Sequence, residues 1–83
     1  MNVKLTYVFE TKDGFRYERE TPEEIIKIVE ENYKALKRIA KDGDSVNMTT
    51  DYRNRYFPSA TISACIQGTW RYYHLRTEVT EIK

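Results

Sequence analysis

The segment from Thr21 to Gly43 constrains the fold of this 83-residue chain more than any other stretch. Thr21 and Glu24 form a capping box, and Pro22 stands at the first helical position, where a missing N–H costs nothing. Gly43 is placed where a left-handed residue commonly ends a helix. The apolar residues between these signals recur with helical spacing and form one face: Ile25, Ile26, Ile28, Val29, Tyr33, Leu36, Ile39 and Ala40. We therefore predict a helix over residues 21–43.

A β-hairpin is predicted before this helix. Apolar and polar residues alternate from Val3 to Phe9, which is typical of a half-buried strand. A three-residue loop, Lys12-Asp13-Gly14, aligns the apolar faces of the two strands because it places Phe9 opposite Tyr17. Glu10 then faces Arg16 on the polar side as a favourable cross-strand charge pair. The second strand is expected to end by Glu20.

Two further strands are predicted directly after the helix. The first runs from residue 44 to residue 56, with Val46, Met48, Tyr52 and Tyr56 on one face. Phe57-Pro58-Ser59 marks a turn, since proline cannot donate within a strand ladder. The second strand covers residues 61–67, and its residues Ile62, Ala64 and Ile66 are expected to face the core.

A last strand is predicted from Thr69 to about Val79. Gly68 allows two interpretations, the bend of a tight hairpin or a kink in one long strand. One face of this strand carries Tyr73, Leu75, Thr77 and Val79, and the other carries Trp70, Tyr72, His74 and Arg76. Both faces are therefore aromatic, which a strand with one buried face does not require.

These elements predict an α+β fold in a single domain over residues 1–83, with the order β-β-α-β-β-β. One long helix is expected to pack on one face of a mostly antiparallel, curved sheet of four to five strands. This order resembles the core of cone-shaped, curved-sheet folds, a likeness that implies no activity. Because a single helix covers a single face, the other sheet face is expected to stay open.

Composition excludes several classes of partner. The formal net charge of +1 argues against bulk nucleic acid or an anionic membrane as a general electrostatic partner. No apolar run has the length of a membrane span, and the N-terminus has no signal-peptide core. The single cysteine, Cys65, cannot form an internal disulfide, which favours a reducing compartment. We therefore expect a soluble, cytoplasmic protein without a cofactor or a metal site.

The segment from Tyr52 to Thr77 is the one compositional anomaly. It contains no acidic residue and no lysine, and it is rich in arginine and aromatic residues. Trp, Tyr and Arg are the residue types enriched at interface hot spots, although aromatics also favour strands and arginine stems pack over them in ordinary sheets. We expect a partner-binding surface formed by Arg53, Arg55, Trp70, Tyr72, His74 and Arg76.

Three other functions are alternatives to protein contact. The same face could stack single-stranded nucleic acid, although the chain is nearly neutral and has no RNP-like run of Gly and Phe. A small-molecule pocket between helix and sheet would be lined by Tyr7, Phe9, Tyr33 and Tyr73, which also fit an ordinary core. Catalysis would depend on Cys65 and His74, the sole residues of their types, on what could be neighbouring strands. We expect no enzyme, because a lone Cys in a strand is usually a small buried hydrophobe.

The leading hypothesis is a small interaction module that works through protein contact or homodimerisation. The helix resembles the idealised helices of engineered proteins, with its capping box, Glu/Lys pairs and terminal glycine. The second half is less regular and resembles a natural, function-carrying sequence. A small chain without motifs is also similar to phage-encoded inhibitors of host enzymes, so an engineered scaffold and a phage-type inhibitor both fit this hypothesis.

Overall fold

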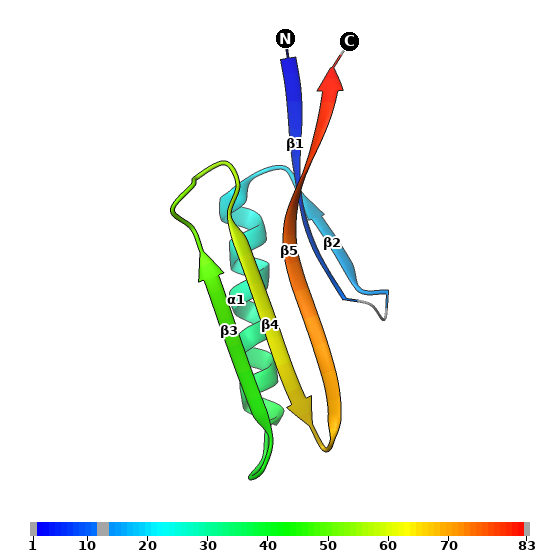
Figure 1. Ribbon diagram of the computed structural model, residues 1–83, viewed down its shortest axis with the longest axis vertical. Coiled ribbons are helices and arrows are strands. Elements are labelled where there is room, and N and C mark those ends of the chain that lie inside the picture. Colours follow the sequence, from blue (N-terminus) through cyan, green and yellow to red (C-terminus); the bar gives the residue numbers. More distant parts are fainter. Residues whose placement is uncertain (1, 12–13, 83) are drawn as a thin grey trace.

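The computed structural model describes residues 2–11 and 14–82, and the described chain forms one helix and a five-stranded antiparallel sheet (Figure 1). The elements are β1 (Asn2–Thr11), β2 (Arg16–Arg19), α1 (Pro22–Ile39), β3 (Ser45–Asp51), β4 (Ser59–Ile66) and β5 (Thr69–Ile82). The strands lie in the order β2-β1-β5-β4-β3. The helix lies behind the sheet in Figure 1, so that no described helix covers the face toward the viewer, here called the helix-free face. The predicted α+β architecture is confirmed.

The helix starts as predicted but ends earlier. Thr21 is the N-cap, and its hydroxyl accepts a hydrogen bond of 3.3 Å from the backbone N–H of Glu24. The predicted end at Gly43 is wrong, because the last helical residue is Ile39. Asp44 accepts a hydrogen bond from the backbone N–H of Lys41 (2.9 Å) and donates its own N–H to the Lys41 carbonyl (2.9 Å). Gly43, with φ 88°, therefore serves this exit turn and not the helix terminus.

The β1–β2 hairpin has the predicted register. Phe9 lies opposite Tyr17 and Glu10 opposite Arg16. The backbone N–H of Thr11 donates to the carbonyl of Phe15 at 2.9 Å, which closes the hairpin. Gly14 has φ 101°, where a residue without a side chain is favoured, whereas residues 12 and 13 of the predicted loop lie outside the described residues.

The strand predicted to reach Tyr56 is too long, because β3 ends at Asp51. The Asp51 carboxylate accepts the backbone N–H of Arg53 (3.2 Å), and the Asn54 side chain accepts that of Tyr56 (3.0 Å). Such local side-chain bonds give the backbone an alternative to the strand ladder. Tyr52 still packs against the core, but Tyr56 is 61% exposed, contrary to the predicted shared face.

Gly68 makes a hairpin bend. Gln67 and Gly68 have φ of 51° and 80° and form a two-residue loop, with Ile66 opposite Thr69. Two consecutive residues with positive φ match the twist of antiparallel strands. The following strand, β5, continues past the predicted end at Val79 to Ile82. Its last residues pair with the first residues of β1 and extend beyond the helix, near the two chain ends in Figure 1.

The core lies between α1 and one sheet face. Helix residues Ile25, Val29 and Leu36 pack against alternate residues of the strands. Phe9 and Tyr73 stack at its centre with ring centroids 5.7 Å apart. The remaining buried members of this cluster are Tyr7, Ala60, Ile62, Ala64 and Leu75.

Candidate functional site

The helix-free face has two unlike halves, and the first consists of β3, β4 and the first part of β5. Because Ile62 and Ala64 are buried beneath the helix, the residues that alternate with them point to the helix-free face. On β3 and β4 these residues are small or polar, whereas on β5 they are large. The small or polar ones are Ser45, Asn47, Thr49, Asp51, Ser59, Thr61, Ser63 and Cys65, and the large ones are Trp70, Tyr72 and His74.

Trp70 and Tyr72 form an exposed pair on β5. Their ring centroids are 6.0 Å apart and the ring planes differ by only 9°. The two residues remain 54% and 45% exposed. Together with His74, which follows at the next position on the same face, they are called the aromatic patch here.

A lower surface borders the aromatic patch. Trp70 lies opposite Cys65, which lies opposite Ser45. In the next row Tyr72 lies opposite Ser63, which lies opposite Asn47. Short side chains beside tall rings make a step on the sheet surface, and we call these four residues (Ser45, Asn47, Ser63 and Cys65) the ledge. None of the four is charged, so the ledge offers only hydrogen-bonding groups and a thiol.

The second half of the helix-free face is a charge cluster of Glu10, Arg16, Glu18, Arg76 and Glu78. The Arg76 guanidinium donates to Glu10 (2.9 Å) and to Glu78 (2.7 Å). The Arg16 guanidinium donates to Glu18 (2.7 Å), Glu10 (3.1 Å) and Glu78 (3.2 Å). Charge-assisted bonds of this kind favour the ionised carboxylates, and Arg76 lowers the pKa of Glu10 and of Glu78 below the usual range.

The structure brings together only part of the predicted site. Trp70, Tyr72 and His74 share one surface, and Arg76 lies on the same face but binds its two glutamates in the charge cluster. Arg53 and Arg55 lie in the β3–β4 loop and not on the aromatic patch.

The two loop arginines have acidic partners of their own. Arg53 pairs with Asp51 at 2.8 Å and lowers the pKa of that carboxyl to about 2. Arg55 lies 3.8 Å from Glu23, in the first turn of α1. Each of the predicted arginines Arg53, Arg55 and Arg76 therefore has an acidic partner.

Cys65 and His74 do not form a pair. The register sets Cys65 opposite Trp70 and His74 opposite Thr61. Trp70 and His74 are four residues apart on one strand, so Cys65 and His74 are separated by about 13 Å. A thiolate–imidazole contact is out of reach at that separation.

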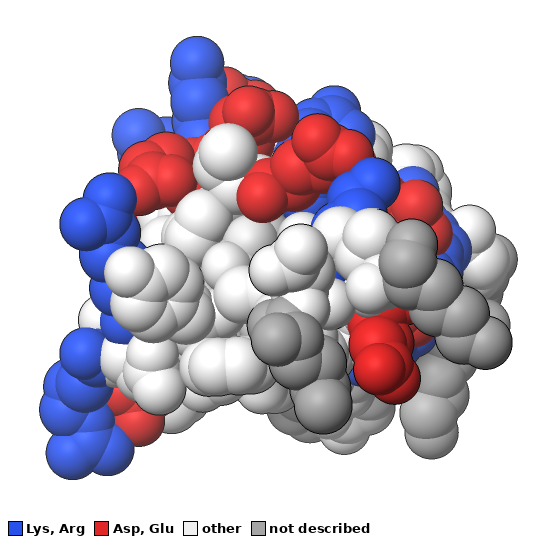
Figure 2. Space-filling model, turned by 90° about the horizontal axis from the view of Figure 1, so that it is seen from above, with Lys and Arg blue, Asp and Glu red and all other residues white. Residues whose placement is uncertain are grey.

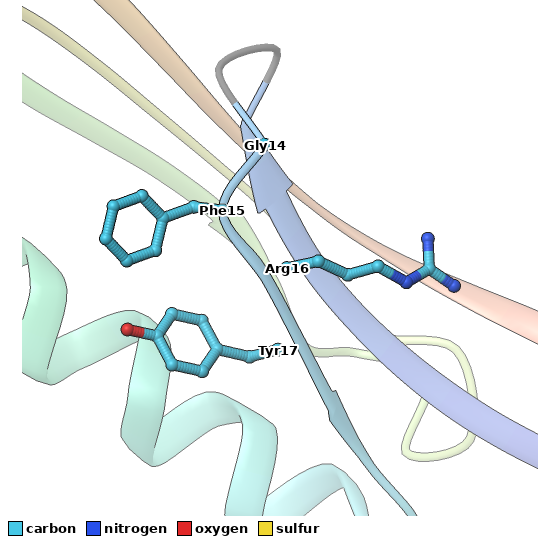
Figure 3. Close-up of a pocket in the computed structure, with 4 residues that line it drawn as sticks. All are labelled: Gly14, Phe15, Arg16 and Tyr17. Atoms are coloured by element: carbon cyan, nitrogen blue, oxygen red, sulfur yellow. The ribbon is translucent and has the colours of Figure 1, made fainter.

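The four residues predicted to line a pocket between helix and sheet belong to the core cluster or pack against it. Tyr7, Phe9 and Tyr73 are buried, and the Lys37 ammonium lies 5.3 Å from the ring centroid of Tyr33. A hollow of about 450 Å³ lies elsewhere, against the four residues Gly14–Tyr17 of the hairpin. Figure 3 shows Phe15 and Tyr17 pointing to one side of this segment, toward the helix, and Arg16 to the other. Its walls come from a single short segment, so this hollow is a surface depression with no enclosing side.

A second exposed apolar region was not predicted from the sequence. Its residues lie toward the paired ends of β1 and β5 and in the β3–β4 loop. Val3, Val79, Tyr56 and Phe57 are each at least half exposed. The view from above shows an uncharged area bordered by mostly basic side chains at the left and by a mixed group of acidic and basic side chains at the top (Figure 2). The exposure of Val3 and Val79 could have been inferred from the sequence, because both residues lie near the chain ends, where a single helix does not cover the sheet.

Comparisons with known proteins gave no match, neither to a protein-family model, nor to a curated protein, nor to a solved structure. Among residues 2–11 and 14–82 there is no group of three or more side chains arranged to hold a metal ion. The one helix in that part of the chain is too polar to span a membrane.

Proposed function

We propose that this chain is a non-enzymatic interaction module that binds a protein partner through the aromatic patch and the ledge. The observation that carries the proposal is the exposed, nearly parallel ring pair of Trp70 and Tyr72 on a sheet face that no described helix covers. Rings held in this way lose little side-chain freedom on binding, and each removes a large apolar area from water.

The layout of the surface fits a protein interface. Binding energy in such interfaces concentrates in a few aromatic residues surrounded by a polar border. Here the two rings have the uncharged ledge on one side and the charge cluster beyond His74 on the other. A partner segment lying on the ledge would contact the ring edges and the hydroxyl groups of Ser45 and Ser63 together.

Single-stranded nucleic acid is the less favoured occupant of the same face. Binding of that class requires cations along the phosphate backbone as well as stacking rings. Arg76 is paired with Glu10 and Glu78, and Arg53 and Arg55 lie in a loop with acidic partners of their own. These three arginines are therefore engaged with carboxylates, which weakens their capacity to neutralise phosphates.

The test is affinity capture with three forms of the purified chain, followed by measurement of the dissociation constant for the captured protein. Trp70→Ala/Tyr72→Ala should weaken binding at least 100-fold, since two interface aromatics are lost. Phe15→Ala is the matched control, because Phe15 is 59% exposed but lies on the hairpin, away from the patch. It should bind like the wild type.

Two outcomes would overturn the proposal. One is a double variant that is folded and binds the same protein as tightly as the wild type. The other is tight binding of a single-stranded oligonucleotide at low salt that weakens steeply as salt is added, which would identify phosphate contacts as the main interaction.

A further inference from the structure

We infer that the outer edge of β3 pairs with the same edge of a second copy of this chain, joining two sheets into one antiparallel sheet. This inference rests on β3 and is independent of the aromatic patch. β3 is the last strand of the sheet, and no described strand lies beyond it (Figure 1). Its outer backbone groups are thus available to another chain.

The turn between β4 and β5 determines which backbone groups these are. In a two-residue hairpin the flanking residues, Ile66 and Thr69, exchange hydrogen bonds. The backbone groups of successive residues in a strand point to opposite neighbours, so those of Ile66 point to β5 and those of Cys65 point to β3. Every second residue before Cys65, namely Ser63, Thr61 and Ser59, therefore also bonds to β3. Their partners on β3 are Ser45, Asn47, Thr49 and Asp51. The N–H and C=O groups of Val46, Met48 and Thr50 consequently point away from the sheet.

The two edges of the sheet are protected to different degrees. β2 has only four residues and carries Arg16, Glu18 and Arg19. β3 has seven residues with consecutive pairing to β4, and therefore no bulge. It contains no proline and no lysine, and Asp51 at its end is its only charged residue. Charges, prolines and bulges are the usual protection against edge pairing, and β3 lacks them along most of its length.

A second copy fits this edge in one register better than in the registers next to it. With Met48 opposite Met48 of the other copy, Val46 lies opposite Thr50 and Thr50 opposite Val46. All three outward-pointing residues then exchange hydrogen bonds, about six in total, whereas a shift by two residues loses one of the three pairs. The two-fold symmetry makes the contact identical for both copies, so the assembly closes as a dimer.

The side chains suit this register as well. Val46 and Met48 are half-buried on the helix side of β3, and a neighbouring strand would cover more of their surface. Asp51 of one copy lies opposite Ser45 of the other, so no like charges meet. Each copy supplies an edge of the same length whose outward-pointing residues Val46, Met48 and Thr50 are uncharged, so a second copy can satisfy the backbone groups of this edge.

Sedimentation equilibrium of the wild-type chain should show a monomer–dimer equilibrium. Thr50→Pro should shift the chain to monomer, because it removes an outward-pointing N–H that lies outside the pairing of β3 with β4. Thr50→Lys should do the same by placing a charge on the edge, and it keeps the test valid if the proline variant fails to fold. Thr50→Val is the matched control and should dimerise like the wild type.

The register can be tested by disulfide formation in a Cys65→Ser background. Met48→Cys should form an intermolecular disulfide under mild oxidation, because the two substituted residues would face each other about 5.5 Å apart. Val46→Cys should not, because residue 46 faces residue 50 of the other copy. Equal cross-linking of both variants would contradict the register.

Two results would overturn the inference as a whole: a chain that stays monomeric at every concentration, and a dimer that survives both Thr50→Pro and Thr50→Lys. Acrylamide quenching of Trp70 separates this inference from the proposed function. An edge dimer leaves the quenching unchanged, whereas self-association through the aromatic patch would protect Trp70.

Discussion

Val8 and Arg76 lie directly opposite each other on β1 and β5, and Val8 is fully buried although it is on the helix-free face. The cover comes from the charge cluster, since Glu18 lies opposite Val8 on its other side and Arg16 bridges Glu10 and Glu18. Arginine stems can bury apolar neighbours while their guanidinium groups stay in water. The charge cluster is therefore a covering layer as well as a set of ion pairs.

Val8→Ala should lower the free energy of unfolding by about 2 kcal/mol, because two buried methyl groups are lost and a small cavity is left. Urea unfolding followed by circular dichroism measures this change. Val3→Ala on the same strand is the control, since Val3 is 50% exposed and its truncation should cost less than about 0.5 kcal/mol. Equal effects of the two substitutions would mean that the charge cluster does not shield Val8.

Glu10→Gln should reduce thermal stability at neutral pH but not in acid. Arg76, and to a lesser extent Arg16, hold the pKa of Glu10 below its ordinary value of 4.5. A carboxylate with a lowered folded pKa stabilises the fold fully above its unfolded pKa and loses that contribution as the pH falls through the folded value. The melting temperatures of wild type and Glu10→Gln should therefore differ at neutral pH and converge as the pH falls below the lowered pKa of Glu10. A constant difference across this range would exclude ionisation of Glu10 as the cause.

Tyr7→Phe should lower the stability of the fold, whereas Tyr52→Phe should not. The Tyr7 hydroxyl donates to the carbonyl of Tyr56 at 3.0 Å, so its removal should cost about 1 kcal/mol. The Tyr52 hydroxyl is buried without a hydrogen-bond partner among the described residues, and burial raises its pKa. Removing it should be neutral or stabilising. Chemical denaturation of both variants decides this, and a costly Tyr52→Phe would reveal a partner for that hydroxyl.

Gln67→Asn should stabilise the β4–β5 hairpin by about 0.5 kcal/mol. Gln67 has φ 51°, a conformation that asparagine adopts more readily than glutamine. The bond from its backbone N–H to the Asp44 carboxylate (3.0 Å) is kept, because the side chain does not take part. Gly68→Ala should instead destabilise by about 1 kcal/mol, since φ 80° strains any residue with a Cβ. A Gln67→Asn variant with lowered stability would contradict this explanation.

Local patterns predicted most of the fold. The N-cap at Thr21 and the matching of Phe9 with Tyr17 each depend on residues close in sequence, and both are confirmed. The ends of α1 and β3 could not be placed. Several residues near each end can form a turn, and the choice depends on the side-chain bonds that Asp44 and Asp51 make.

The candidate site was predictable only in part. Alternation along β5 alone put Trp70 and Tyr72 on one face. The partners of Arg76 were not predictable, because Glu10 lies 66 residues away and meets it only through the pairing of β1 with β5. Burial of Val8 depends on the same long-range pairing, which leaves no periodic trace in the sequence.

Fluorescence of Trp70 tests the central claim most directly, because this residue is the only tryptophan of the chain and lies in the aromatic patch. In the free protein, acrylamide should quench its emission readily, since the side chain is about half exposed. Binding of the partner protein should lower the acrylamide quenching constant of Trp70 severalfold and shift the Trp70 emission to shorter wavelength. Partner binding that leaves the quenching of Trp70 unchanged would contradict the assignment of this face as the binding surface.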